Sequence, residues 1–130
     1  METKFNFKSQ VCTSKVQSER LLALGLKKET ADMFHNAIHS GTKIVGYSVA
    51  LGCNYKHFEV FTNDIPAWSL GRLLALVNGE DWRAEITLKD KRYGIHYEYD
   101  SYWYDDIFEA VIAWIESDIK EGYFPKEYLV

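Results

Sequence analysis

The sequence is poor in cysteine and proline, lacks a basic excess and has no long apolar run. It contains two cysteines in 130 residues. Cys12 and Cys53 could form at most one disulfide, and without an export signal we expect both thiols to be reduced. No run approaches the roughly 18–20 apolar residues that span a bilayer. The formal net charge of −4 argues against binding to a phosphate backbone or an anionic membrane surface. These absences predict a cytoplasmic protein with neither nucleic-acid nor membrane partners.

Sequence motifs for catalysis and cofactor binding are also missing. Neither the Gly-x-Ser-x-Gly pattern nor the glycine-rich phosphate-binding patterns occur. His35 and His39 are four residues apart, but Asn36 stands where a zinc-protease helix would carry its glutamate. Neither Cys12 nor Cys53 has a neighbour at zinc-ligand spacing. We therefore expect surface or half-buried histidines, a structural thiol at Cys12, and no metal, cofactor or catalytic residue.

Aromatic residues are what this sequence has in excess. Nine tyrosines, seven phenylalanines and four tryptophans exceed what the core of a small domain needs. The apolar share of 47% and the charged share of 26% exclude a disordered chain. The length fits one compact domain. We predict a single domain over residues 1–130, with an extended lead-in over 1–12 and a C-terminal tail over 123–130.

Four segments carry helical signals. Ser14 and Gln17 have the spacing of a capping box, and Gly25 is a typical residue just after a helix. Ser69 precedes a leucine-rich stripe of helical period, and Asp105 or Asp106 is suited to cap the last helix. Apolar spacing also predicts a shorter helix beginning at Glu29. The four helices are expected over residues 14–24, 29–38, 69–77 and 105–121.

Alternating apolar residues predict two β-hairpins. Residues 44–51 are expected to pair with 57–62, and residues 82–89 with 92–99. In the second hairpin, a register that sets Leu88 against Tyr93 also places Glu85 opposite His96 as a charge pair. The predicted order is α-α-β-β-α-β-β-α. Two antiparallel hairpins forming a sheet, with amphipathic helices on one face, define an α+β domain.

The segment from residue 97 to residue 106 holds the richest local chemistry. It contains four tyrosines, one tryptophan and four acidic residues. Tyr97 and Tyr99 fit the inner side of the second hairpin, and Asp105 or Asp106 is needed as a helix cap. The remaining aromatics, Tyr102, Trp103 and Tyr104, either pack against their own hairpin or form a binding surface, since tyrosine and tryptophan are preferred anchors at interfaces. The candidate binding residues, in loops or at element ends, are Tyr55, Trp68, Asp100, Tyr102, Trp103 and Tyr104.

Three function classes remain open on these observations. The preferred one is a non-catalytic binding module that engages a protein partner or self-associates through its loop aromatics. The alternative is a module that binds or sequesters a small ligand, with rings stacking on a nucleotide base or a sugar. The third is a hydrolase that uses the carboxylates near Asp100 and Asp105, since paired carboxylates beside aromatics serve glycoside hydrolysis.

Three longer segments carry a resemblance to a group of proteins. They are residues 11–33, with Val11-Cys12-Thr13-Ser14 at their start, residues 64–74 and residues 110–123. Together they resemble short uncharacterised proteins encoded by gut anaerobic bacteria and by their phages or prophages. The resemblance implies an accessory gene of a mobile element, whose product binds a host protein or sequesters a signalling nucleotide. It carries no functional residues over to this chain.

Overall fold

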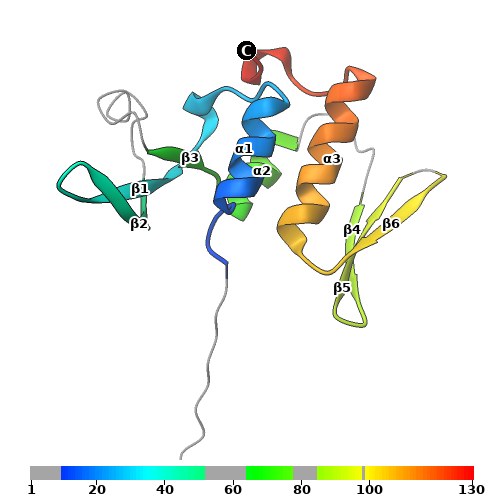
Figure 1. The fold of residues 1–130 in the computed structure, drawn as a ribbon. Helices are drawn as coiled ribbons and strands as arrows, with labels where there is room; N and C mark the ends of the chain where they lie inside the picture. The colour runs from blue at the N-terminus through cyan, green and yellow to red at the C-terminus, as the bar shows by residue number, and fades with distance from the viewer. Residues whose placement is uncertain (1–9, 52–63, 78–84, 98) are drawn as a thin grey trace, which may run out of the picture.

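The computed structural model describes residues 10–51, 64–77, 85–97 and 99–130, which form three α-helices and two three-stranded antiparallel sheets. The helices lie between the two sheets (Figure 1). The α+β class is confirmed, although the two hairpins belong to separate sheets rather than to one. The helices are α1 (Lys15–Ala23), α2 (Leu70–Val77) and α3 (Ile107–Glu121), with short 3-10 turns η1 (Lys28–Thr30) and η3 (Lys126–Tyr128).

The predicted helix ends are confirmed in detail. The Ser14 hydroxyl accepts a hydrogen bond from the Gln17 amide at 3.1 Å, and the Gln17 side chain accepts one from the Ser14 amide at 3.0 Å. Asp106 caps α3 by accepting from the Phe108 amide at 2.9 Å. Gly122 ends α3 in the left-handed conformation, with φ of 79°. These local patterns act within one turn of the chain, so the sequence alone specifies them.

The helix expected over residues 29–38 is wrong. This segment forms η1 and then strand β1 (Met33–Ser40), which pairs with β2 (Lys43–Leu51) on one side and β3 (Ile65–Ala67) on the other. The central place in a sheet outweighs the helical spacing of its apolar residues. The connecting turn places Gly41 at φ of 66°, as a two-residue hairpin of type II′ requires. The predicted strand over 57–62 lies outside the described residues.

The second hairpin is confirmed in register. Strands β4 (Glu85–Lys89) and β5 (Arg92–His96) pair Leu88 with Tyr93 and Glu85 with His96. Strand β6 (Ser101–Tyr104) then returns along β5. The strand predicted to continue through Tyr99 ends earlier, because the chain turns there, and the Tyr99 side chain is 88% exposed rather than inward-facing. Residues 82–84 and residue 98, which the predicted strands include, lie outside the described residues.

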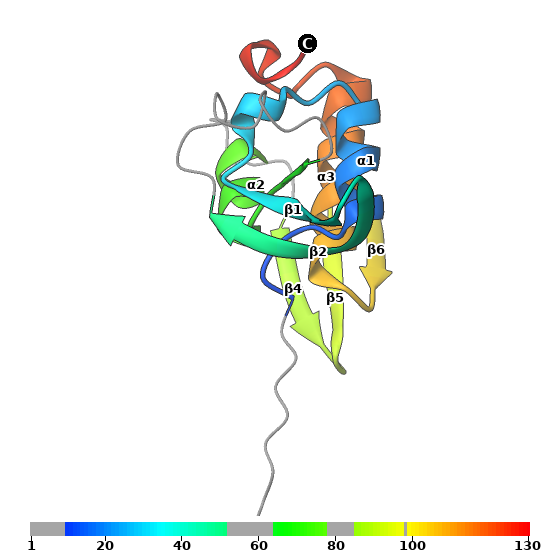
Figure 2. The ribbon, with the colours of Figure 1, turned by 60° about the vertical axis from the view of Figure 1, so that its left-hand side comes forward.

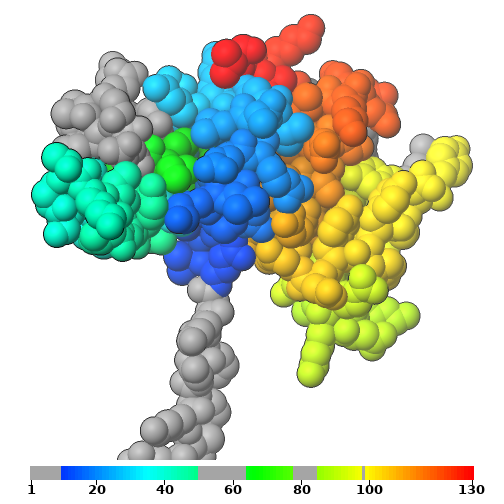
Figure 3. Space-filling view, in the orientation of Figure 1, coloured from blue at the N-terminus to red at the C-terminus, as the bar shows by residue number. Residues whose placement is uncertain are grey.

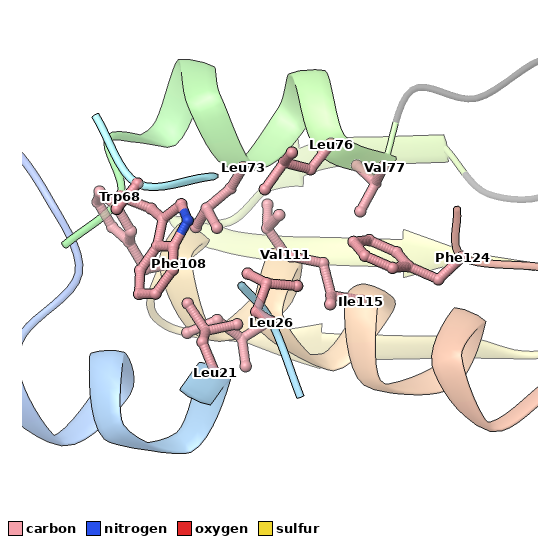
Figure 4. Packing of buried hydrophobic residues seen from close by; sticks show 12 residues of the cluster. Leu21, Leu26, Trp68, Leu73, Leu76, Val77, Phe108, Val111, Ile115 and Phe124 are labelled. Atoms are coloured by element: carbon pink, nitrogen blue, oxygen red, sulfur yellow. The ribbon is translucent and has the colours of Figure 1, made fainter. Parts of the chain in front are cut away.

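The main core lies among the three helices and the segments beside them, and Ile86 of the second sheet packs against it. Figure 4 shows Trp68 and Phe108 at one end of this cluster and Phe124 at the other. Phe124, in the segment predicted as a C-terminal tail, is 3% exposed because this segment folds back, with the Val130 amide donating to the Gly25 carbonyl at 2.7 Å. The fully or nearly buried members are Leu21, Leu26, Ala31, Trp68, Leu73, Leu76, Val77, Phe108, Val111, Ile112, Ile115 and Phe124.

Helix α1 buries a partly polar face. Val16 is 67% exposed, whereas Gln17 and Ser18 are buried. The first sheet packs beside the start of this helix, and the Lys15 ammonium lies 4.2 Å from the centre of the Tyr47 ring in β2. The view in Figure 2 shows β1 and β2 crossing in front of the helices. A cation–π contact therefore joins the first sheet to the start of α1.

Candidate functional site

The second sheet has one face against α3 and one face away from it. Residues that pair across neighbouring strands share a face. Ile95 is 1% exposed and packs with Ala110 of α3, so it lies on the face toward α3, which we call the inner face. Tyr102 pairs with Ile95 across the strands and therefore belongs to the same face; a set of residues paired in this way is called a row below. The neighbouring row therefore lies on the outer face, and it consists of Thr87, Gly94 and Trp103.

Trp103 is held in place across the middle of the outer face. A Cβ atom added at Gly94 would lie 2.9 Å from Cζ3 of Trp103 and 3.0 Å from Cη2, so the indole occupies the space that a side chain at position 94 would take. The His96 ring meets the indole edge-on, with the ring centres 5.3 Å apart. Even so, Trp103 remains 37% exposed. The tryptophan is thus fixed by its neighbours and still presented to solvent.

His96 is fixed by two hydroxyl groups. Its Nε2 lies 2.5 Å from the Thr87 Oγ1, and its Nδ1 lies 2.8 Å from the Ser101 Oγ. The predicted charge pair between Glu85 and His96 is replaced by these two bonds, although the register that places them opposite each other is correct. A serine beside a histidine is reminiscent of nucleophilic catalysis, but the third group here is a hydroxyl instead of the carboxylate that orients a catalytic imidazole. The two hydroxyl groups hold the His96 ring, and this ring in turn orients the Trp103 indole.

The acidic residues near the site have structural contacts, those of Asp105 and Asp106 through their carboxylates and that of Asp100 through its backbone carbonyl. Asp105 forms an ion pair with Arg92 at 3.1 Å. Asp106 caps α3 and also accepts a hydrogen bond from the Gln17 side chain at 3.0 Å. The Asp100 carbonyl accepts from the Tyr97 amide at 2.7 Å and closes the turn between β5 and β6. Each of these acids has a place in the architecture of the sheet or of the helix that follows it.

The candidate residues chosen from the sequence divide into three groups. Tyr102, Trp103 and Tyr104 lie together, but in strand β6 rather than in a loop, and Tyr102 is 50% exposed. Trp68 does not belong to this surface: it is completely buried, because its backbone follows β3 into the core. Asp100 lies next to β6 and is exposed. Tyr55 lies outside the described residues.

Sequence reasoning missed the residues that support Trp103. Gly94 in the middle of a strand is a signal that could have been used, since such glycines often mark a close approach of another group. Thr87, His96 and Ser101 could have been grouped only after β6 was known to pair with β5. The site residues that the structure adds are Thr87, Gly94, His96 and Ser101.

The cysteine and the histidines of the first sheet have structural surroundings. Cys12 is a free thiol, 3% exposed, and burial together with the nearby Asp32 raises its pKa, which disfavours the reactive thiolate. His35 lies in a strand, with Nε2 2.8 Å from the Thr13 carbonyl oxygen. Among the described residues, no group of three or more His, Cys, Asp or Glu side chains is placed to hold a metal ion.

Comparisons with known proteins add no assignment. A scan against protein-family models, a search of curated proteins and a search of solved structures gave no match. A check of the helices within the described ranges found none with the length and apolar character needed to cross a membrane. The function is therefore inferred from the geometry of the second sheet.

Stability at alkaline pH is expected to depend on the inner tyrosines of this sheet. Burial raises the pKa of Tyr97, and the same cause raises the pKa of Tyr104. A raised pKa means that the folded state keeps the phenol proton more tightly than the unfolded state does. This stabilisation is complete below the ordinary tyrosine value of about 10 and is lost as the pH rises above it. We expect the urea midpoint to fall between pH 9 and pH 11, and to fall less in Tyr97→Phe. Equal losses in both proteins would contradict the assignment.

Proposed function

We propose that this protein is a non-catalytic binding module that engages a protein partner through the outer face of its second sheet. We call this surface the Trp103 face and define it by Thr87, Gly94, His96, Ser101 and Trp103. The observation that carries the proposal is the fixed but exposed indole, 37% accessible and supported by His96 and Gly94. Tryptophan is among the residues that contribute most to binding energy at interfaces.

A fixed aromatic ring lowers the cost of association. Ordering a side chain at an interface opposes binding by roughly 0.5–1.5 kcal/mol for a mobile residue. Trp103 already has its orientation, because Gly94 leaves room only for the indole and His96 is itself held by Thr87 and Ser101. The free protein therefore presents the ring in a defined orientation.

The surroundings of Trp103 have the composition of an interface rim. Lys89 and Glu85 are exposed on β4, and the Arg92–Asp105 ion pair lies on the same side as Trp103, with Arg92 also reaching the Trp103 carbonyl at 3.4 Å. Interfaces commonly surround an apolar centre with polar groups that remain in contact with water. Charges of both signs favour a partner of mixed charge over a polyanion. The resemblance to proteins of mobile elements supports a host protein as that partner.

The test compares three baits in affinity capture followed by binding measurements on the purified partner. Trp103→Ala removes the anchor, and Gly94→Ala adds a Cβ that forces the indole or His96 to move. Val45→Ala is the control, because this residue is 61% exposed on the first sheet, on the other side of the helices. We expect Trp103→Ala to weaken binding by about 2 kcal/mol or more, roughly thirtyfold in Kd. Retention of every captured partner by Trp103→Ala would overturn the proposal.

A small ligand is the second candidate, and one observation favours it. Two hydroxyl groups and an imidazole lie beside the exposed indole, so a flat ring could stack while its substituents form hydrogen bonds. Sugars and nucleotide bases have this chemistry. Titration with a panel of both, followed through the indole N–H signal of Trp103 by NMR, distinguishes the candidates. A signal that does not move across the panel removes this alternative.

A further inference from the structure

The free edge of β6 differs from the other sheet edges of the described chain. Four described strands lie at edges: β2, β3, β4 and β6. Strand β3 contains Pro66, β4 carries Glu85 and Lys89 at its ends, and β2 has a register irregularity opposite Ile38 and His39. Proline, charged side chains and bulges are devices that keep edge strands from pairing with other chains. Strand β6, Ser-Tyr-Trp-Tyr, has none of them and keeps a regular register with β5.

The hydrogen-bonding pattern shows which backbone groups β6 offers. The Tyr97 amide donates to the Asp100 carbonyl and closes the turn, so the pair formed by these two residues is hydrogen-bonded. Hydrogen-bonded and non-bonded pairs alternate along an antiparallel ladder. Ile95 and Tyr102 are therefore a bonded pair, whereas Ser101 and Trp103 direct their amide and carbonyl groups away from β5. The Arg92 side chain also contacts the Trp103 carbonyl oxygen, at 3.4 Å.

We propose that two copies of this chain pair through β6 in antiparallel fashion, with Tyr102 of each copy facing Tyr102 of the other across a twofold axis. In this register the backbone amide and carbonyl of Ser101 in one copy form hydrogen bonds with those of Trp103 in the second. The four outward backbone groups of each strand, the amides and carbonyls of Ser101 and Trp103, then all have partners. A carbonyl oxygen has two lone pairs, so the Arg92 contact does not prevent Trp103 from accepting this bond. Tyr104 then faces Asp100 of the second copy, which pairs a phenol donor with a carboxylate acceptor.

The neighbouring registers are less favourable. A register centred on Trp103 would place Asp100 opposite Asp106 of the second copy, and like charges directly opposite are destabilising. A register centred on Ser101 would extend the pairing beyond the end of β6 and into the turn at Tyr99. The register centred on Tyr102 avoids both and uses the whole strand.

Charge and exposure also favour a second copy as the occupant. Three acidic residues near β6 are paired within their own chain: Asp105 with Arg92, Glu109 with Arg20, and Glu116 with Lys120. Asp100, which is exposed next to β6, would lie opposite the Tyr104 phenol of the second copy and not opposite another acid. Tyr102, 50% exposed at the strand edge, would be covered by its own copy. In the space-filling view, the end of the chain segment around β6 projects from one side of the molecule (Figure 3).

Pairing at this edge has a consequence for the proposed function. The dimer does not depend on that function; only the consequence described here rests on it. The outer faces of both copies would join into one surface that carries two Trp103 anchors. A partner with two matching sites would bind the dimer more tightly than a monomer, without any new kind of contact.

Sedimentation equilibrium tests the pairing, because a dimer has twice the 15.1 kDa of the monomer. A short edge interface predicts a Kd in the micromolar range, since interfaces below about 1,200 Å² belong to weak complexes. Tyr102→Lys and Tyr102→Glu each place like charges on the twofold axis, and we expect at least a tenfold weaker dimer from each. Mixing the two variants should restore a dimer, because opposite charges then face each other. Leu88→Lys, a change at a residue 65% exposed on β4, is the control and should dimerise as the wild type does.

Disulfide trapping tests the register independently. Non-bonded antiparallel pairs have Cα atoms about 4.5 Å apart, within the range that a disulfide can bridge. In a Cys53→Ser background, Tyr102→Cys should form a cross-linked dimer on oxidation and Tyr104→Cys should not. A wild-type chain that remains monomeric at all concentrations, or a Tyr102→Lys chain that dimerises normally, would overturn the inference. A monomer that still loses its partner through Trp103→Ala would leave the proposed function standing.

Discussion

Replacing Trp68 with alanine is expected to lower the free energy of unfolding by about 3–5 kcal/mol. The side chain is fully buried in the main core, and its indole N–H donates to the Thr30 hydroxyl at 2.9 Å. The substitution removes apolar packing, leaves a cavity and takes away the hydrogen-bond donor that holds η1 beside β3. Because small domains have only about 5–15 kcal/mol of stability, this loss is a large share of the total and should lower the urea midpoint strongly.

Urea denaturation followed by far-UV circular dichroism measures this effect. Tyr99→Ala is the matched control: it also truncates an aromatic side chain, but one that is 88% exposed in the turn between β5 and β6. We expect the control to change stability by about 1 kcal/mol or less, as exposed positions usually do. Similar losses in the two variants would contradict the placement of Trp68 in the core.

Thr13→Val is expected to destabilise the fold by about 2–3 kcal/mol, although the two side chains have nearly the same shape. Thr13 is completely buried, and its hydroxyl accepts from the Trp68 amide at 3.0 Å and lies 2.8 Å from the Ser18 hydroxyl. Valine would keep the packing but leave these polar groups without their partner. A buried donor or acceptor without a partner costs more than a typical hydrogen bond contributes.

Thr13→Ser separates the contribution of the hydroxyl group to stability from that of the methyl group. Serine keeps the oxygen and loses one methyl, so we expect it to retain more stability than valine does in the same urea titration. If Thr13→Ser were the more destabilised variant, apolar packing rather than the hydrogen bonds would hold α1 against β3.

The parts of the fold that follow from short-range patterns were predictable. Ser14, Gln17 and Asp106 cap helices through bonds to residues two or three positions away, and the register of β4 and β5 follows from alternation across a short turn. Strand β1 was not predictable in this way. Its sequence also has helical spacing, and the deciding interactions come from β2 and β3 on either side of it.

The candidate site was predictable as a set of aromatic residues but not as a surface. Tyr102, Trp103 and Tyr104 stand out in the sequence, yet their division between two sheet faces depends on the pairing of β6 with β5. Trp68 looked equally unexplained in the sequence, because its burial depends on contacts with Thr13 and Thr30, which are distant along the chain. Composition shows that aromatic residues are in excess, and tertiary structure determines which of them reach solvent.

The hydrogen bond between Gln17 and Asp106 connects two helix starts that are 89 residues apart. Gln17 completes the capping box of α1, and Asp106 is the N-cap of α3, so each helix start depends on the other for part of its hydrogen bonding. On the ribosome, the capping box of Ser14 and Gln17 can form locally, whereas the bond to Asp106 cannot form until that residue has also been made and has left the exit tunnel. The docking of the two helix starts against each other therefore comes later than the formation of the first cap.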